Sequence, residues 1–134
     1  MSTTAGRARG PARGWDTPRV SSQVVSIAKL PSLKLAEGIA AQALFGEGVM
    51  LMVVELDPGS ELPKHEHPQE QLGVVLEGEL RLVVSGTEHV LGELDAYALA
   101  GGVEHSARAG KKGATVLDVF HPVREEYRAA ASAQ

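Results

Sequence analysis

Short apolar runs alternate with turn-forming residues over most of this chain. Between Ile39 and Phe120 an apolar run recurs roughly every 8–12 residues, and glycine, proline or serine marks the ends of most runs. This recurrence is typical of an all-β sandwich or barrel. The chain has 15 glycines and 7 prolines but only 4% aromatic residues, which also favours many short strands over long helices. We therefore predict an all-β, closed domain.

The strongest predicted strand runs from Val49 to Leu56, because it is nearly continuous in apolar residues and ends at a turn. Pro58 fixes φ and Gly59 accepts a positive φ, so the turn has a physical cause. A strand that is apolar on both faces lies between two layers, or between a barrel interior and a partner subunit. The other predicted elements are strands at Val24–Ile27, Leu33–Leu35, Ile39–Phe45, Gln71–Leu76, Leu80–Val84, Glu88–Leu91, Tyr97–Leu99, His105–Ala109 and Ala114–Phe120, a tight turn at Glu77-Gly78, and a short helix or tail from Val123 to about Ala131.

Residues 1–20 are rich in arginine, glycine and proline, and we predict a flexible tail there, followed by one domain over residues 21–134. Residues 1–19 carry four arginines against one aspartate, so the remainder is more acidic than the net charge of −4. This balance argues against nucleic-acid binding, although the arginines could pair with an acidic partner chain. No segment resembles a secretion signal or a membrane span, so we expect a cytoplasmic protein without membrane contact.

Three histidines and one glutamine form a predicted metal site. His65 and His67 are one residue apart, so on a strand both side chains point to the same face. Gln71 opens the next apolar run, and a fold-back of the chain could bring its amide oxygen beside the two imidazoles. His105 is available to close the site from a distant segment. The chain has no cysteine, so thiolate ligands are excluded, and the expected ion is zinc, nickel, iron or manganese.

Other readings of these residues stay open at the level of sequence. His65 and His67 could be exposed loop histidines close to prolines. Glu70 competes with Gln71 for the fourth ligand position, whereas strand alternation points Glu66 away from the histidine pair. Three neutral imidazoles and a neutral amide would leave the double charge of the ion uncompensated, so the site should attract anionic ligands.

Two motifs resemble those of the cupin superfamily. Gly59, His65-x-His67, Gln71 and Gly78 resemble the first cupin motif, with glutamine where most cupins carry glutamate. Residues 101–105, Gly-Gly-Val-Glu-His, resemble the second motif, with alanine at position 100 where a proline is usual. The resemblance covers roughly residues 38–128. It implies a double-stranded β-helix, or jelly-roll, barrel and a homodimer.

The segment from Asp118 to Tyr127 resembles the closing segment of the pectin-degradation, KdgF-type cupins. That resemblance implies a metal-dependent enzyme, isomerase-like, that converts unsaturated uronates into linear keto acids. It also implies that Asp118, Phe120 and Arg124 lie near the substrate. Asp118 is suited to moving protons, and Arg124 can clamp the carboxylate of an anionic small molecule.

Several alternatives compete with this reading. Asp118 and Arg124 could form only a structural salt bridge. Gln69 stands where many relatives have a third histidine, which bears on the identity of the substrate. The same barrel could house a metal-dependent dioxygenase, a polyketide-cyclase-like enzyme, or a small-molecule binder without catalysis, because a fold does not fix a function.

Overall fold

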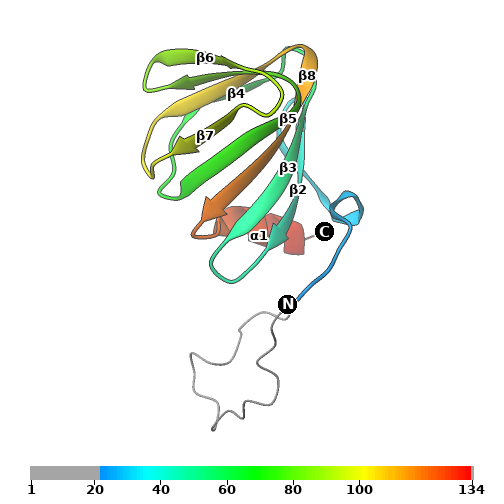
Figure 1. Ribbon diagram of the computed structural model, residues 1–134. Coiled ribbons are helices and arrows are strands. Elements are labelled where there is room, and N and C mark those ends of the chain that lie inside the picture. Colours follow the sequence, from blue (N-terminus) through cyan, green and yellow to red (C-terminus); the bar gives the residue numbers. More distant parts are fainter. Residues whose placement is uncertain (1–21, 134) are drawn as a thin grey trace, which may run out of the picture.

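The structure, a computed structural model, describes residues 22–133, and almost all of its regular structure is strand. No helix in this range is long and apolar enough to cross a membrane. Figure 1 shows the strands wrapped into a barrel, with the C-terminal helix at one end. The elements are the 3-10 helix η1 (Ile27–Lys29), the strands β1 (Ser32–Ala36), β2 (Ile39–Phe45), β3 (Met50–Leu56), β4 (Glu61–His65), β5 (Glu70–Val84), β6 (Thr87–Leu91), β7 (Ala96–Leu99) and β8 (His105–His121), and the helix α1 (Glu125–Ser132).

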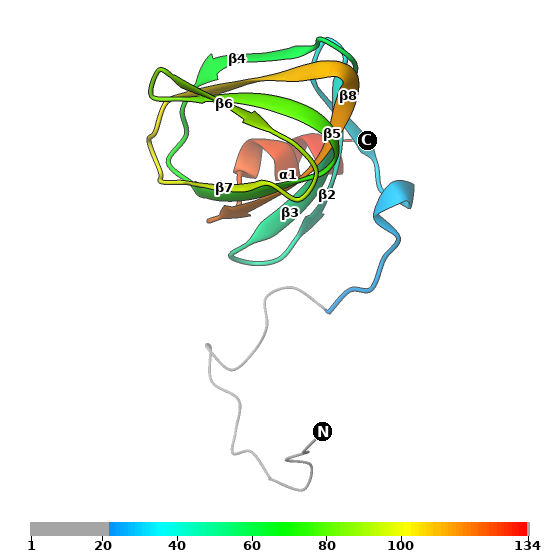
Figure 2. The same ribbon diagram turned by 45° about the horizontal axis from the view of Figure 1, so that its top comes forward.

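Two long antiparallel strands, β5 and β8, form the frame of the barrel and pair from Glu70↔His121 to Val84↔His105. The C-terminal part of β8 also pairs with β3, and the N-terminal part of β5 pairs with β7. At the other end, β4 joins the start of β8, and β6 joins the end of β5. The sheet therefore folds into two facing layers, β1-β2-β3-β8-β5-β7 and β4-β8-β5-β6, which Figure 2 shows from a second direction. This is the predicted all-β jelly roll.

The bend between the layers lies where β5 and β8 cross from one layer into the other. The β5–β8 register shifts on both sides of Gly78, which has a φ of 85°. A Cβ at Gly78 would lie 2.2 Å from the carbonyl oxygen of Gly113, so only glycine lets the two backbones approach this closely. The bend turns one strand pair into two walls of a cavity.

The predicted tight turn at Glu77-Gly78 is wrong. These residues lie inside the continuous strand β5, because the positive φ of Gly78 bends the strand instead of reversing it. The residues predicted as separate strands at His105–Ala109 and Ala114–Phe120 are likewise two parts of β8.

The predicted strand at Val24–Ile27 is wrong as well. Val24 is fully exposed, and Ile27 begins η1. The side-chain amide of Gln42 donates to two carbonyl oxygens of this turn and thereby holds it against β2. The predicted helical option near the C-terminus is confirmed by α1. The predicted flexible tail lies outside the described residues.

The core fills the space between the two layers with aliphatic side chains and one aromatic ring. Strand alternation sends every second residue of β2, β3 and the N-terminal part of β5 inward, as their burial patterns show. The buried cluster consists of Ile39, Ala41, Ala43, Met50, Met52, Val54, Leu56, Val75, Leu80, Ala109, Ala114, Val116, Phe120 and Val123. The candidate site lies at one side of this core.

Candidate functional site

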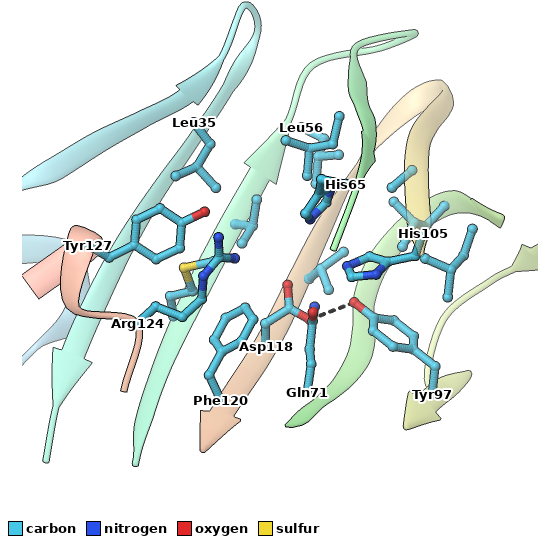
Figure 3. Close-up of a pocket in the computed structure, with 17 residues that line it drawn as sticks. Leu35, Leu56, His65, Gln71, Tyr97, His105, Asp118, Phe120, Arg124 and Tyr127 are labelled. Carbon is cyan, nitrogen blue, oxygen red and sulfur yellow. Dashed lines mark hydrogen bonds between the residues drawn. The ribbon is translucent and has the colours of Figure 1, made fainter. Parts of the chain in front are cut away.

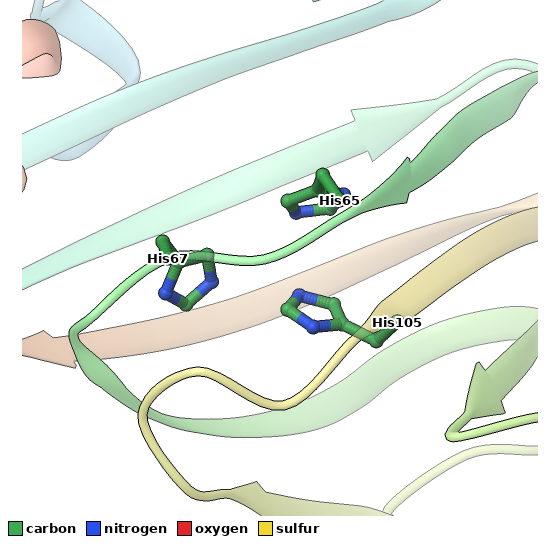
Figure 4. A group of neighbouring side chains, drawn as sticks. All are labelled: His65, His67 and His105. Carbon is green, nitrogen blue, oxygen red and sulfur yellow. The ribbon is translucent and has the colours of Figure 1, made fainter.

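Three histidines from two distant segments meet inside the barrel. His65 ends β4 and pairs in register with His105 at the start of β8, while His67 lies in the loop that follows β4. The ring centroids of His65 and His105 are 4.3 Å apart, and those of His67 and His105 are 5.0 Å apart. One ring nitrogen from each residue can be chosen so that all three lie within 4.8 Å of one another (Figure 4). The predicted histidine cluster is therefore present.

The backbone fixes which ring nitrogen of each histidine faces the cluster. Each Nδ1 lies at hydrogen-bonding distance from the carbonyl oxygen of a residue two positions away, so a proton on Nδ1 satisfies that oxygen. Each Nε2 then keeps a free lone pair, as a metal ligand requires. The three contacts are His65 Nδ1 to Pro63 O at 2.9 Å, His67 Nδ1 to Gln69 O at 3.1 Å and His105 Nδ1 to Val103 O at 2.9 Å.

Gln71 joins this cluster from the opposite layer. Its Oε1 lies 3.0 Å from Nε2 of His67. If His67 is protonated on Nδ1, two hydrogen-bond acceptors face each other at this distance, and a cation between them would satisfy both. Gln71 is 7% exposed, whereas its competitor Glu70 is exposed to solvent. The donor set therefore fits a transition metal held by His65, His67, His105 and the amide oxygen of Gln71.

The surroundings of His67 and His105 favour the neutral form of both imidazoles. Burial lowers the pKa of His67, and the positive charge of Arg124 lowers it further. Burial likewise lowers the pKa of His105, with a smaller contribution from His65. Because a protonated imidazole cannot bind a metal, lowered pKa values favour metal binding at neutral pH.

A second polar group lies beside Gln71 on the same layer. Oδ1 of Asp118 accepts two hydrogen bonds, from the Tyr97 hydroxyl at 2.6 Å and from Nε2 of Gln71 at 3.0 Å. Burial raises the pKa of Asp118 above its ordinary value, although both hydrogen bonds oppose this effect. Burial and the charge of Asp118 raise the pKa of Tyr97 as well. Asp118 is therefore a carboxyl group with an increased tendency to hold a proton.

A small cavity of about 50 Å³ connects the histidines, Asp118 and the C-terminal helix. Figure 3 shows Arg124 and Tyr127 on the side of the cavity opposite His105. The guanidinium carbon of Arg124 lies 4.3 Å from the ring centroid of Tyr127 and 5.1 Å from that of Phe120. The rest of the wall is mainly aliphatic, so polar chemistry is confined to a few groups: His65, Gln71, Tyr97, His105, Asp118, Arg124 and Tyr127.

The structure does not contain the salt bridge considered between Asp118 and Arg124. Arg124 instead pairs with Glu126, whose Oε2 lies 3.1 Å from Nη2. The side chain of Arg124 is only 11% exposed, yet that of Glu126 is 58% exposed. Arg124 thus remains a cation at the cavity wall whose partner lies on the solvent side.

All the residues predicted for the site lie in or beside this cavity. His65, Gln71, His105, Asp118, Phe120 and Arg124 line it, and His67 is buried next to it. Tyr97 and Tyr127 also line the cavity but were not among the predicted site residues. Tyr127 closes the segment from Asp118 that resembles the KdgF-type cupins, and that motif could have indicated it. No local motif marks Tyr97, because its position depends on which strand lies opposite. His89 and His121 are exposed and do not line the cavity.

Comparison with known sequences places the site within a known family. A family model described as a cupin domain matches residues 52–120. The pectin degradation protein KdgF of Dickeya dadantii is 24% identical over 99 residues, which cover 72% of this chain and 90% of that protein. The β-D-galactosidase Rv1717 of Mycobacterium tuberculosis is 39% identical over 70 residues, covering 51% of this chain and 60% of that protein.

Solved structures show the same fold. A RmlC-like cupin from Shewanella frigidimarina is 28% identical, with a TM-score of 0.74 and coverage of 80% of this chain and 96% of that chain. KdgF from a Halomonas species is 22% identical, with a TM-score of 0.74 and coverage of 80% and 99%. The likeness therefore extends over the described barrel and nearly the whole of both solved chains.

Proposed function

This chain belongs to the cupin domain family, and we propose that it is a metal-dependent enzyme of the KdgF type that converts unsaturated uronates into linear keto acids. The observation that carries the proposal is the position of Asp118, a buried carboxyl on the wall that it shares with Gln71, lining the same cavity as His65 and His105. Such a group can exchange a proton with a substrate bound in the cavity.

In this proposal Arg124 binds the substrate and Asp118 transfers protons. Arg124 clamps the substrate carboxylate, because its guanidinium is buried at the cavity wall and its fork of donors matches a carboxylate. Ring opening breaks the bond between the hemiacetal carbon and the ring oxygen; the hemiacetal hydroxyl loses its proton and becomes a carbonyl, and the ring oxygen gains a proton and becomes an enol hydroxyl. In the tautomerisation that follows, Asp118 donates its proton to carbon and takes one back from the enol hydroxyl. The metal, which we expect to be zinc, nickel, iron or manganese, supplies Lewis acidity toward a substrate oxygen.

The cavity must widen to admit a sugar acid. A volume of about 50 Å³ accommodates one or two water molecules. Arg124 and Tyr127 are at the start of the short helix α1, which has no fully buried residue. An outward shift of these two side chains would enlarge the cavity without disturbing the histidines.

The mainly aliphatic wall favours a second candidate, a metal-dependent dioxygenase or polyketide-cyclase-like enzyme with a less polar substrate. Oxygen uptake by the iron-loaded or nickel-loaded protein would identify the dioxygenase. Glycoside hydrolysis fits less well, because it commonly uses two carboxyl groups. Among the described residues that line the cavity, Asp118 is the only carboxyl.

The test combines metal analysis with a turnover assay. The purified protein should contain about one equivalent of a transition metal and consume unsaturated uronates, measured as loss of the ultraviolet absorbance of their conjugated double bond. Asp118→Asn should lower kcat by about 10²–10⁴-fold. Glu88→Gln, an exposed carboxyl on β6, is the matched control and should leave kcat unchanged. A metal-loaded protein that consumes no unsaturated uronate would contradict the proposal and leave the second candidate or a binding function.

We also propose a homodimer formed through the outer face of the larger layer. Two rows of uncharged side chains, mostly apolar, cross β2, β3, β8 and β5, and Leu72 within them is 51% exposed. A second copy can cover this face without bringing like charges together, as a two-fold interface requires. The rows are Leu44-Leu51-Val119-Leu72 and Gln42-Val53-Leu117-Val74.

Sedimentation equilibrium tests this assembly. Leu72→Glu should convert the dimer into a monomer. Val90→Glu places the same charge on β6 of the other layer, where Val90 is 53% exposed, and should leave the dimer intact. A wild-type protein that sediments as a monomer would overturn the dimer while leaving the proposed chemistry unaffected.

A further inference from the structure

Tyr97 reaches the site across an intervening strand, and a glycine makes this possible. Gly73 on β5 is the register partner of Tyr97 on β7 and of Asp118 on β8, so the three residues form one row across the sheet. A Cβ added at Gly73 would lie 2.1 Å from Cζ of Tyr97. The tyrosine ring therefore lies over the backbone of β5, in the space that a larger residue at position 73 would fill.

The Tyr97 hydroxyl and the side-chain amide of Gln71 both donate hydrogen bonds to the carboxyl group of Asp118. The hydroxyl donates a 2.6 Å hydrogen bond to Oδ1 of Asp118, the interaction drawn as a dashed line in Figure 3. The same oxygen accepts the amide nitrogen of Gln71 at 3.0 Å. Because the amide nitrogen points at Asp118, the amide oxygen of Gln71 must point the other way, toward Nε2 of His67.

We propose that Tyr97 is a positioning residue that sets the orientation of both Asp118 and Gln71. Gly73 is required for this role because a side chain at position 73 would displace the Tyr97 ring. The chain of contacts runs from the Tyr97 hydroxyl through Oδ1 of Asp118 to the amide of Gln71. Without the hydroxyl, the carboxyl of Asp118 can rotate about its own side chain. The amide of Gln71 then loses the fixed acceptor that holds its oxygen toward the histidines.

This role differs from simple satisfaction of a buried carboxyl. A structural role predicts a loss of stability when the hydroxyl is removed and no change in the metal centre. A positioning role predicts a change in metal affinity and in the electronic environment of the ion, since partners behind metal ligands typically alter affinity or activity by about 10–100-fold. The kinetic part of the test rests on the proposed function, but the metal part does not.

The main variant is Tyr97→Phe, which keeps the ring over Gly73 and removes only the hydroxyl. We expect its affinity for zinc, measured by competition with a chelating dye, to fall about 10-fold. The visible absorption spectrum of the cobalt-substituted protein should shift, because the amide ligand is less well oriented. With an unsaturated uronate, kcat should fall by about 10-fold or more, while KM, which depends on Arg124, should change less than twofold.

Gly73→Ala tests the reach of the ring. It should reproduce the metal defect of Tyr97→Phe, because the new Cβ displaces the ring. Gly92→Ala is the matched control, since a Cβ there meets only the Asp95 carboxylate at 3.9 Å, an ordinary contact. The control should bind zinc with wild-type affinity.

The outcomes separate this inference from the proposed function. If the wild-type protein binds metal but consumes no uronate, the proposed function fails, and the zinc affinity and cobalt spectrum of Tyr97→Phe still decide the role of Tyr97. Wild-type zinc affinity together with a wild-type cobalt spectrum in a folded Tyr97→Phe protein would overturn the inference. If Gly73→Ala does not fold, Tyr97→Phe alone decides.

Discussion

Two neighbouring rows on the inner face of the same sheet have opposite chemistry. One row, Ala41-Val54-Val116-Val75, is aliphatic, and each of its members is at most 2% exposed. The next row contains Met52, Asp118, Gly73 and Tyr97, and its carboxyl group is 7% exposed. The first row needs only side chains of the right volume. The second needs a hydrogen-bond partner for each buried polar atom, which ties its residues to one another.

The comparison teaches how a barrel core can contain a carboxyl group at all. Asp118 is tolerated because Tyr97 and Gln71 both donate to it, and because the missing side chain of Gly73 admits Tyr97. A carboxyl one row away would find only aliphatic neighbours. Substitutions that exchange the character of the two rows therefore test the comparison directly.

The largest effect is expected when a carboxyl is placed in the aliphatic row. Val116→Asp should lower the free energy of unfolding by about 3–5 kcal/mol or prevent folding, because a buried polar group lacks partners there. Urea denaturation followed by circular dichroism measures the change. Val90→Asp on β6 is the control and should change the free energy by less than about 0.5 kcal/mol, since Val90 is exposed. Equal stability of Val116→Asp and wild type would contradict the contrast between the rows.

The next largest effect is expected on zinc affinity, when one imidazole of the histidine cluster is removed. His105→Ala removes one imidazole and should weaken zinc binding by more than about 100-fold, beyond the range typical of residues behind the ligands. Isothermal titration calorimetry or dye competition measures the loss. His89→Ala, an exposed histidine on β6, should bind zinc like the wild type. Retained affinity in His105→Ala would show that the three imidazoles do not share one ion.

The buried carboxyl of Asp118 should make the stability of the metal-free protein depend on pH. Burial raises the pKa of Asp118 in the folded state, so this group favours the folded state at low pH and this contribution is lost as the pH rises through the folded pKa. Asp118→Asn has no proton to lose. Its melting temperature should therefore exceed that of the wild type by roughly 2–6 °C at pH 8 and converge with it near pH 3. Scanning calorimetry across this range would contradict the argument if the difference were independent of pH.

The smallest effect is expected outside both rows, at the ion pair of Arg124 with Glu126. Because the side chain of Glu126 is 58% exposed, water and salt screen the pair. Glu126→Gln should lower the free energy of unfolding by less than about 1 kcal/mol. Urea denaturation measures it, with Glu88→Gln as a control, because Glu88 is an exposed carboxylate on β6. A loss of several kcal/mol would mean that this pair matters more than the buried network.

The recurrence of short apolar runs was sufficient to predict an all-β, closed domain, and the resemblance of two motifs to those of cupins implied the jelly roll. The histidine pair was predictable because its arrangement depends on a local pattern. Two imidazoles one residue apart face the same way on any extended segment. The role of Gly78 was not predictable in the same way. A glycine with positive φ can reverse a chain or bend a strand, and only the pairing of β5 with β8 decides between these outcomes.

Tyr97 could not be predicted for a different reason. Its contact with Asp118 depends on an exact match between three strands and on the small residue in the middle one. No periodicity within a single strand contains that information. The Asp118–Arg124 salt bridge, considered as an alternative to a role in substrate binding, does not form, because Arg124 pairs with Glu126 instead.

The shared use of β8 has a consequence for how the protein folds. This strand pairs with β3, β4 and β5, so both layers depend on a segment that the ribosome synthesises after all the other described strands. Contacts between residues so far apart in sequence slow folding, because long loops must close first. Until residues 105–121 emerge from the ribosome, β4 lacks its partner strand, and β3 and β5 each keep an open edge that is prone to association. The metal site and the fold would then be completed in the same late step.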